Sequence, residues 1–348
     1  HEVTVPSIRL DCYSRRMRAT RWAILGPGTI SADFAQSLQQ SEHGILHAVA
    51  SSNAERAAHF ARNHGVALSG SYESVLDRDD VDAVYIGTVH TTHAELAIAA
   101  LSAGKAVLCE KPISPTLDET LRVLKAARDA HVPFVEAFKY RFGPLAATLR
   151  DLIATGEIGD IQKLEAGFGF TVEHREGRLF DPQLAGGAIL DAGAYPASLA
   201  VGIATWAPHG TRQPGPRRLS VTSGEGEIGS TGVDEWATAE VSSGDFAASI
   251  RTSIVADLPR SCTIVGTRGA IEVSNVWGSR HESATELILN PSGRPAQTMS
   301  FATVDPMAAE ADAVSLALDD GRVEIPEMPW ADSIATAELL GQWRASLN

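Results

Sequence analysis

The sequence predicts an α/β chain, with an N-terminal doubly wound parallel sheet and a C-terminal α+β domain whose large open sheet is mostly antiparallel. From residue 21 to residue 137, short apolar strands alternate with amphipathic helices, which is typical of right-handed βαβ units. From residue 161 onward, consecutive strands of alternating polarity are separated by short turns, which favours antiparallel pairing. The 348 residues provide enough chain for two domains.

The elements of the first domain follow one another in a strict alternation. We expect its helices over about 29–40, 54–64, 92–103 and 116–130, and a hairpin-like link between the second helix and the third strand. Residues 1–16 show no periodic pattern and are interpreted as an extension or an added remnant, so the predicted domains span 17–138 and 139–348. The predicted strands are RWAIL (21–25), ILHAVAS (45–51), VDAVYIG (81–87), AVLCE (106–110) and PFVEA (133–137).

The second domain is expected to begin with a helix over 144–155 and to end with helices over about 306–318 and 330–346. The Pro/Gly-rich stretch 207–218 is predicted to be a loop. The predicted strands are IQKLEAGFGF (161–170), LSVTSGEG (219–226), DEWATAEVSS (234–243), FAASIRTSIV (246–255), SCTIVGTRG (261–269), AIEVSN (270–275) and TELILN (285–290).

Composition excludes several classes of function. The formal net charge of −14 disfavours partners such as nucleic acid or an acidic membrane surface, because phosphates attract clustered Lys and Arg. We find no transmembrane segment and no secretory signal, and we interpret the protein as cytoplasmic. The three cysteines, Cys12, Cys109 and Cys262, are too few for a disulfide framework. A small-molecule partner is therefore expected.

The motif GPGTIS (26–31) lies between a predicted strand and a predicted helix. In a Rossmann dinucleotide site Gly26 makes the tight turn, Gly28 lets a pyrophosphate approach, and the amides at the helix start bind the phosphates. Ser31 occupies the place of the usual third glycine, where a small residue still permits close packing. A plain Gly/Pro turn is the alternative, but the surrounding βαβ unit favours a nucleotide site.

The second strand ends in HAVASSNAER, which carries no carboxylate to hold a ribose 2′-hydroxyl. Ser51, Ser52 and Arg56 could instead bind a 2′-phosphate, whose charge a carboxylate would repel. Helix capping by Ser52 or Asn53 is the alternative. The sequence thus favours NADP over NAD.

The segment VLCEKPIS places Glu110 and Lys111 at the carboxyl edge of the sheet, where open α/β sheets bind ligands. Pro112 ends the strand and restricts Lys111 to an extended backbone, so that its ammonium group is held in position. An ordinary surface lysine is the alternative.

The segment GGAILDAGAYPAS (186–198) carries Asp191 and Tyr195 in an otherwise small and apolar run. A spacing of four residues would place both side chains on one face of a helix. Pro196 is compatible only with the first turn of a helix or with a kink, so Asp191 could precede the regular helix. A helix cap and a core aromatic are the structural alternatives.

The segments GPGTIS, TVHTTHAELAIAALSAGKAVLCEKP, VEAFKYRFGP and RLFDPQLAGGAILDAGAYP resemble the Gfo/Idh/MocA oxidoreductase family, and the resemblance covers essentially the whole chain after Met17. The resemblance is greatest to the branch of dihydrodiol dehydrogenases, xylose dehydrogenases and glucose-fructose oxidoreductases. It implies catalytic roles for Lys111, Asp191 and Tyr195. Departures from the family pattern occur at Thr88–His90, where a Pro-Asn pair is common, and at 139 and 143 in VEAFKYRFGP.

The resemblance also implies two sets of binding residues. Separately, no metal site is expected, because His90 and His93 are three residues apart but have no third ligand near them. Residues expected to bind NADP or NAD are Gly26, Gly28, Thr29, Ile30, Ser51, Ser52, Arg56, Thr88, His90, His93, Glu110 and Lys111. Residues expected to face the substrate are Tyr140, Arg141, His174, Arg178 and Phe180.

The implied reaction transfers hydride between the cofactor and a hydroxyl or carbonyl group of a sugar, polyol or cyclic diol. A base must accept the hydroxyl proton as the carbonyl forms. Tyr195 is the expected acid/base, with its pKa lowered by the Lys111 ammonium, and Asp191 is expected to orient the substrate or the lysine.

Two other functions are compatible with the same motifs. One is an NAD-dependent glycoside hydrolase of the same family, which would release sugar without net formation of reduced cofactor. The other is a non-catalytic dinucleotide-binding sensor, which would need only the glycine motif. The relatives implied by the resemblance associate through the open sheet, so a homodimer or homotetramer is expected.

Overall fold

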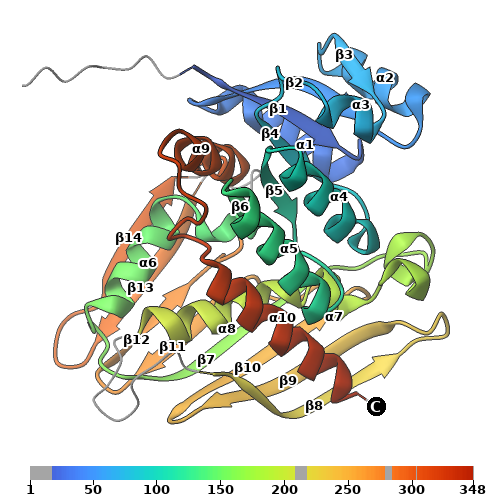
Figure 1. Cartoon of the computed structure of the whole chain (residues 1–348). Helices are drawn as coiled ribbons and strands as arrows, with labels where there is room; N and C mark the ends of the chain where they lie inside the picture. Colours follow the sequence, from blue (N-terminus) through green and yellow to red (C-terminus); the bar gives the residue numbers. More distant parts are fainter. Residues whose placement is uncertain (1–17, 208–217, 279–283, 303, 348) are drawn as a thin grey trace, which may run out of the picture.

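Two sheets organise the chain, which a computed structural model describes over residues 18–207, 218–278, 284–302 and 304–347 (Figure 1). The first sheet has six parallel strands in the order β3-β2-β1-β4-β5-β6. This order is that of the predicted doubly wound fold, which is therefore confirmed. The strands are β1 (Thr20–Leu25), β2 (Gly44–Ala50), β3 (Leu68–Gly70), β4 (Ala83–Ile86), β5 (Ala106–Glu110) and β6 (Phe134–Ala137).

Helices connect these strands much as the sequence predicts, but the expected hairpin-like link is wrong. It contains β3, which pairs parallel with β2, and a short helix. The strand has three residues, LSG, which are too few to show a polarity pattern, so it could not be predicted from the sequence. The helices are α1 (Thr29–Ser37) with η1 (Leu38–Gln40), α2 (Ala54–Asn63), α3 (Tyr72–Leu76), α4 (His90–Ser102) and α5 (Leu117–Ala130).

The second sheet has eight strands in the order β14-β13-β12-β11-β7-β10-β9-β8. Among its described strands only β7 and β10 run parallel, so the predicted, mostly antiparallel sheet is confirmed. The last strand was not predicted. The strands are β7 (Ile161–Gly169), β8 (Ser220–Ile228), β9 (Asp234–Ser243), β10 (Phe246–Ser253), β11 (Cys262–Gly266), β12 (Gly269–Val273), β13 (Ala284–Pro291) and β14 (Gln297–Ala302).

Helices cover one face of this second sheet, and α8 and α10 lie along it (Figure 1). The α8 helix is buried over nearly its whole length, which explains its almost uniformly apolar sequence. The loop expected at 207–218 lies almost entirely outside the described residues, as does the extension 1–16. The helices are η2 (Lys139–Arg141), α6 (Pro144–Ala154), η3 (Arg178–Phe180), η4 (Pro182–Leu184), α7 (Ala188–Asp191), α8 (Ala194–Trp206), α9 (Pro306–Asp319) and α10 (Trp330–Ala345).

The C-terminal helices return to the first domain. Asp312 of α9 accepts hydrogen bonds from the Ser41 hydroxyl at 2.5 Å and from the His43 amide at 3.0 Å. Trp330, at the start of α10, donates from its indole nitrogen to the carbonyl oxygen of Phe134 at 3.0 Å. The helices α9 and α10 therefore contact elements of both domains.

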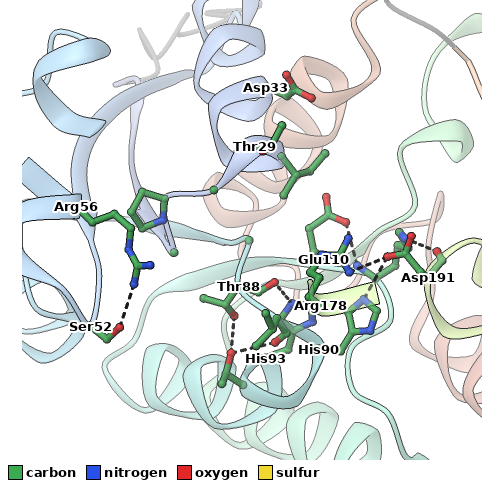
Figure 2. Close-up of a pocket in the computed structure, with 18 of the residues that line it drawn as sticks. Thr29, Asp33, Ser52, Arg56, Thr88, His90, His93, Glu110, Arg178 and Asp191 are labelled. Atoms are coloured by element: carbon green, nitrogen blue, oxygen red, sulfur yellow. Dashed lines mark hydrogen bonds and ion pairs between the residues drawn. The ribbon is translucent and has the colours of Figure 1, made fainter. Parts of the chain in front are cut away.

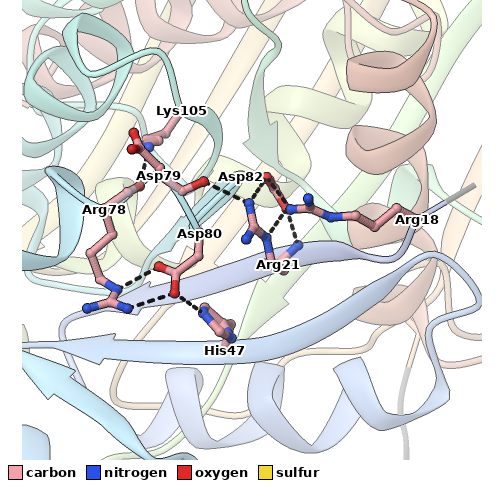
Figure 3. Close-up of polar contacts among 8 residues, drawn as sticks. All are labelled: Arg18, Arg21, His47, Arg78, Asp79, Asp80, Asp82 and Lys105. Carbon is pink, nitrogen blue, oxygen red and sulfur yellow. Dashed lines mark hydrogen bonds and ion pairs between the residues drawn. The ribbon is translucent and has the colours of Figure 1, made fainter.

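A cluster of charged residues lies at the amino edge of the first sheet (Figure 3). Arg21 binds Asp82 through two guanidinium nitrogens, each at 2.8 Å. Asp80 pairs with Arg78 at 2.6 Å and with the His47 ring at 3.1 Å. These pairs join β1 and β2 to the segment before β4.

Three further observations apply to the described part of the chain. Cys109 and Cys262 are buried free thiols. No group of three His, Cys, Asp or Glu side chains there could hold a metal ion. No single described helix is long and apolar enough to cross a membrane, although the bent pair 182–191 and 194–206 passes by length and composition.

Candidate active site

A cleft with a cavity volume of about 740 Å³ opens at the carboxyl edge of the first sheet and faces the second domain (Figure 2). This is the edge where doubly wound sheets bind ligands. All three residues expected to be catalytic line it, and so does Arg178. Of the twelve residues expected at the cofactor, all but Ser51 line it, namely Gly26, Gly28, Thr29, Ile30, Ser52, Arg56, Thr88, His90, His93, Glu110 and Lys111.

The glycine-rich loop forms one end of the cleft. Gly26 has a φ of +91°, and a Cβ there would lie 2.3 Å from the Thr88 side chain. Gly28 is the N-cap of α1 and provides no side-chain cap, so the first amides of the helix remain available to an anion. Buried Ser31 donates a hydrogen bond to the Gly26 carbonyl at 2.6 Å. The Ser31 hydroxyl occupies the space where a side chain at Gly87 would lie. The Ser31 hydrogen bond thus stabilises the glycine-rich loop. Gly26, Gly28 and the first amides of α1 together fit a dinucleotide pyrophosphate.

The end of β2 shows how the predicted phosphate residues are arranged. Arg56 extends from α2 and donates to the Ser52 hydroxyl at 3.4 Å (Figure 2). It also donates to the Ser51 hydroxyl at 3.2 Å. Ser51 is buried beneath the cleft wall and supports the guanidinium group. Asn53 caps α2 by accepting from the Arg56 amide at 2.9 Å, so the capping alternative is confirmed for Asn53. Arg56 itself remains directed to the rim.

At the end of β5, Glu110 and Lys111 point in different directions. Glu110 accepts a hydrogen bond from the Tyr85 hydroxyl at 2.8 Å. Lys111 donates from Nζ to the backbone carbonyl of Asp191 at 2.5 Å, and the same nitrogen lies 5.0 Å from the centre of the Tyr195 ring. The ammonium group therefore joins the strand end to the segment that carries both other candidate catalytic residues. The peptide bond between Lys111 and Pro112 is cis.

The segment 186–198 forms two helices instead of one. Asp191 ends α7, Tyr195 is the second residue of α8, and the chain bends by 50° between 182–191 and 194–206. The expectation that a single helix face carries both side chains is therefore wrong, and the alternative that Pro196 indicated, with Asp191 before the regular helix, is confirmed. The bend still brings Asp191 and Tyr195 into the cleft.

The two leading glycines are required by close packing. A Cβ on Gly186 would lie 2.5 Å from the Leu179 carbonyl oxygen, and one on Gly187 would lie 2.3 Å from a carboxylate oxygen of Asp234. Gly187 also has a φ of +112°. Asp234 accepts from the Ile189 amide at 2.6 Å and so holds the start of α7. This buried carboxylate positions the helix that ends in Asp191.

Two polar groups lie beside the Asp191 carboxylate (Figure 2). Arg178 pairs with Oδ1 at 2.9 Å, and the His90 ring nitrogen Nε2 is 3.8 Å from the same oxygen. Burial opposes the charged form, but Lys111 and Arg178 outweigh it, and the pKa of Asp191 falls below its ordinary value. Asp191 is therefore ionised at neutral pH.

Tyr195 keeps its proton in this structure. Burial, followed by the carboxylates of Glu110, Glu310 and Asp191, raises its pKa well above the ordinary value of 10.0. The expected lowering of this pKa by Lys111 is therefore not found, because the ammonium group lies over the ring and is itself bound to a carbonyl. The phenol is available here as a proton donor.

His93 connects two loops of the cleft. Its buried ring lies between the carbonyl oxygens of Pro112, 2.9 Å from Nδ1, and Thr88, 3.2 Å from Nε2. Burial lowers its pKa, so the ring is neutral and donates to one of these two carbonyls. It thereby ties the segment after Lys111 to the loop at the start of α4.

Four residues expected to face the substrate do not line the cleft. Phe180 packs in a small apolar cluster with Val233 and Ile254. His174 is exposed on the surface. Tyr140 donates to the Ser198 hydroxyl at 3.0 Å, and buried Arg141 is paired with Asp332.

Seven lining residues were not predicted. Most are neighbours of predicted ones, so the motifs themselves pointed to them. Phe168 is different, because it comes from β7 of the second domain and faces the Tyr195 ring at 5.0 Å between centres. The only signal for it was an aromatic residue near the end of a predicted strand. The seven are Pro27, Asp33, Tyr72, Gly87, Val89, Thr92 and Phe168.

Comparison with known proteins gives matches along the chain. Residues 20–138 match the model of an oxidoreductase family with an NAD-binding Rossmann fold, and residues 146–272 match the GFO/IDH/MocA C-terminal domain. Trans-1,2-dihydrobenzene-1,2-diol dehydrogenase from Xenopus tropicalis is 33% identical over 336 residues, which cover 93% of this chain and 97% of the relative. The enzyme of that name from Homo sapiens is 33% identical over 342 residues, with 95% and 97% covered.

Solved structures share the fold at lower identity. A 3-ketoreductase from Actinomadura kijaniata, in complex with NADP and TDP-benzene, has a TM-score of 0.83 at 22% identity and covers 95% of this chain and 98% of its own. An aldose-aldose oxidoreductase from Caulobacter crescentus, complexed with glycerol, has a TM-score of 0.82 at 19% identity, with 94% and 97% covered.

Proposed function

The chain belongs to the Gfo/Idh/MocA oxidoreductase family, and on this premise we propose that it is an NADP-dependent dehydrogenase of cyclic diols or sugars. The expected dinucleotide cofactor follows from the family, and its glycine loop is present in this chain. The preference for NADP is supported by Arg56, whose guanidinium group two serine hydroxyls hold at the rim of the cleft. The diol or sugar class is supported by the names of the relatives.

One observation carries the proposed chemistry, namely the position of Lys111 Nζ between the Tyr195 ring and the Asp191 carbonyl inside the cleft. The bound nicotinamide would supply or accept the hydride. Tyr195 holds a proton that it gives to the oxygen of a carbonyl substrate, or it takes the proton back from a hydroxyl. Lys111 stabilises negative charge that develops on that oxygen, and ionised Asp191 orients the substrate.

The second domain supplies the walls around this centre. The ring of Phe168 lies 5.0 Å from that of Tyr195 and the ring of Trp277 lies 5.7 Å from it, measured between ring centres. These aromatic side chains exclude water from the phenol and hold its ring in one orientation. Gly26 and Gly28 would hold the cofactor phosphates opposite them.

The test is removal of the phenolic hydroxyl. Tyr195→Phe should lower kcat by about 100-fold or more, as loss of an acid/base group does, and should leave the Kd for NADPH within about twofold. Tyr140→Phe is the matched control, because it removes a buried phenol hydroxyl that lies outside the cleft, and it should keep turnover. Near-full turnover by Tyr195→Phe would disprove the assigned role.

A further inference from the structure

A second cavity, with a volume of about 60 Å³, lies where the start of α6 meets β13, β14 and the start of α9 (Figure 1). Among the described residues, none lines both this cavity and the cleft. Both positions at which VEAFKYRFGP departs from the family pattern, Lys139 and Gly143, line the second cavity. The proposed hydride transfer uses neither residue, so family membership does not explain this feature of the chain.

Lys139 brings an unbalanced positive charge to the cavity. Its side chain is half-buried, and none of the described residues forms a hydrogen bond or an ion pair with its ammonium group. Burial, followed by the Glu110 carboxylate, raises the pKa of Glu310 well above 4.5, and Lys139 opposes this increase only in part. The neighbouring Glu310 carboxyl group is therefore protonated and does not neutralise the ammonium group.

Hydrogen-bond donors from two other elements face the same cavity. Gly143 is the N-cap of α6 without a side-chain cap, and Pro144 follows it, so the next amides, beginning with Leu145, are available to an anion. Thr285 of β13 is only 7% exposed, and no described residue forms a hydrogen bond with its hydroxyl group. A hydroxyl group enclosed this far needs a ligand or a water as its partner.

The size and the walls of the cavity indicate the kind of anion. Because one water needs about 10–15 Å³, the cavity has room for about four to six non-hydrogen atoms. A monocarboxylate of about two to four carbon atoms has this size. Its hydrocarbon part fits the apolar walls, whereas phosphate carries more charge and is costly to dehydrate against them. These walls include Phe142, Leu145, Val276 and Phe301.

We propose that this cavity binds the carboxylate group of a small organic acid, which the Lys139 ammonium, the Thr285 hydroxyl and the first amides of α6 hold. The bound acid contacts Tyr140, whose ring lines the cavity and lies 6.1 Å from the Tyr195 ring and 5.3 Å from the Trp277 ring, between centres. The site thus adjoins the aromatic wall of the candidate active site. The carboxylate has two sources, a free short-chain acid or the acid group of a substrate that extends from the cleft.

The experiment titrates propionate and its neutral isostere propionamide into the complex of the full chain with NADPH, and saturation-transfer NMR follows each ligand. Propionate should bind with a Kd of about 1 mM, at least about tenfold more tightly than propionamide, because only the anion pairs with the ammonium group. Lys139→Met keeps the length of the side chain without its charge. It should raise the Kd for propionate by about tenfold or more and leave the Kd for propionamide within about twofold.

Three further variants test the individual donors. Lys139→Arg keeps the positive charge and should retain most of the preference for propionate. Thr285→Val keeps the shape of the side chain without the hydroxyl group, and it should weaken propionate binding by about threefold or more. Lys125→Met removes an exposed lysine of α5 and should change neither Kd.

Turnover of glucuronate and of glucose with NADP⁺ distinguishes the two sources of the carboxylate. A higher kcat/KM for glucuronate that disappears in Lys139→Met indicates the acid group of a substrate. Propionate binding without any such advantage indicates a free acid. The NMR titration does not need turnover, so failure of the proposed dehydrogenase function leaves the test of this site intact.

The proposal is overturned if propionate and propionamide bind equally, or if Lys139→Met weakens both in parallel, because the cavity would then recognise only the apolar part of the ligand. It is also overturned if Lys139→Met binds propionate as tightly as the wild type, since propionate would then bind elsewhere. Displacement of propionate by inorganic phosphate with an equal Kd would overturn the assignment to a carboxylate.

Discussion

At the scale of single residues, the protonation state of Tyr195 determines whether the site can start with carbonyl reduction or with alcohol oxidation. Its raised pKa keeps the phenol neutral over the range in which the protein is assayed. A neutral phenol donates to a carbonyl immediately, whereas oxidation of a hydroxyl first needs the phenolate or a proton acceptor beyond it. The cleft is thus arranged for proton donation.

We therefore predict opposite pH profiles for the two directions. The rate of carbonyl reduction should stay level from about pH 6 to pH 9, because the acid form of Tyr195 persists when its pKa lies above 10.0. The rate of alcohol oxidation should rise with pH across the same range. Steady-state kcat in both directions tests this. A reduction rate that already halves near pH 8 would contradict the raised pKa of Tyr195.

Arg56 is the residue on which cofactor choice depends. Arg56→Ala should raise KM for NADP by about tenfold or more, because the 2′-phosphate loses the guanidinium group that binds it. KM for NAD should change little, because NAD lacks this phosphate. Arg62, in the last turn of the same helix, is the control position. Equal losses with both cofactors would indicate that Arg56 supports the fold of the rim.

At the scale of elements, the turn before α7 depends on glycine for two separate reasons. Gly187 has a positive φ, and the space for its Cβ is occupied by Asp234. Gly232 also has a positive φ, of +88°, but nothing lies within 4 Å of its Cβ position. The two positions therefore share the backbone strain and differ only in the steric clash.

Gly187→Ala should lower the free energy of unfolding by about 2 kcal/mol more than Gly232→Ala, the difference being the cost of overpacking. It should also lower kcat, because displacement of Asp234 releases the start of the helix that ends in Asp191. Chemical denaturation and kinetics of both variants measure this. Equal effects on stability would mean that the Asp234 side chain moves aside freely.

Glu136 of β6 supports the segment after Lys111 by accepting from the Ile113 amide at 3.2 Å. Burial raises its pKa from 4.5 to about 7. An acid whose pKa is raised by folding destabilises the protein as pH increases, since the unfolded chain ionises near 4.5 and the folded chain only near 7. The loss begins above about pH 4.5 and is complete above about pH 7, at about 3 kcal/mol.

Glu136→Gln should accordingly be more stable than the wild type at pH 8 and lose that advantage by pH 4, because glutamine is neutral at both pH values and its carbonyl can still accept from Ile113. Thermal unfolding as a function of pH tests this. Glu225→Gln, an exposed position on β8, is the control and should show no such trend. A pH-independent difference would mean that packing, and not charge, distinguishes glutamate from glutamine at residue 136.

At the scale of the whole molecule, the sequence predicted what depends on short-range pattern. The glycine loop and the end of β5 adjoin strong strand signals, and their residues line the cleft as a consequence of the fold class. The short β3 was missed because it is too brief to show a period. The break between α7 and α8 was indicated only by Pro196, and the sequence did not show the packing at Gly193, where a Cβ would lie 2.7 Å from the Ile189 carbonyl oxygen. Packing of this kind has no periodic signature.

Long-range pairing was the other part that the sequence could not provide. Arg141 follows the first domain in a motif that the family resemblance associates with substrate. Its Nη1 pairs at 2.5 Å with Asp332 of α10, and both side chains are almost completely buried. The two residues are 191 positions apart. Nothing at residue 141 indicates a partner at that distance, so the sequence could not show that this arginine pairs with Asp332.

This pair gives a test of how the C-terminal helix is held to the junction of the two domains. Arg141→Met should destabilise the fold by about 3 to 5 kcal/mol, because it leaves Asp332 charged and unpaired in the interior. Combining it with Asp332→Leu should recover much of that loss, since an apolar pair can replace a buried ion pair of similar volume. Denaturation of the single and double variants measures the recovery, and KM for the substrate is measured in the double variant. An unchanged KM in a folded double variant would mean that Arg141 only stabilises the fold. A KM raised tenfold or more would mean that Arg141 contributes to substrate binding despite its burial.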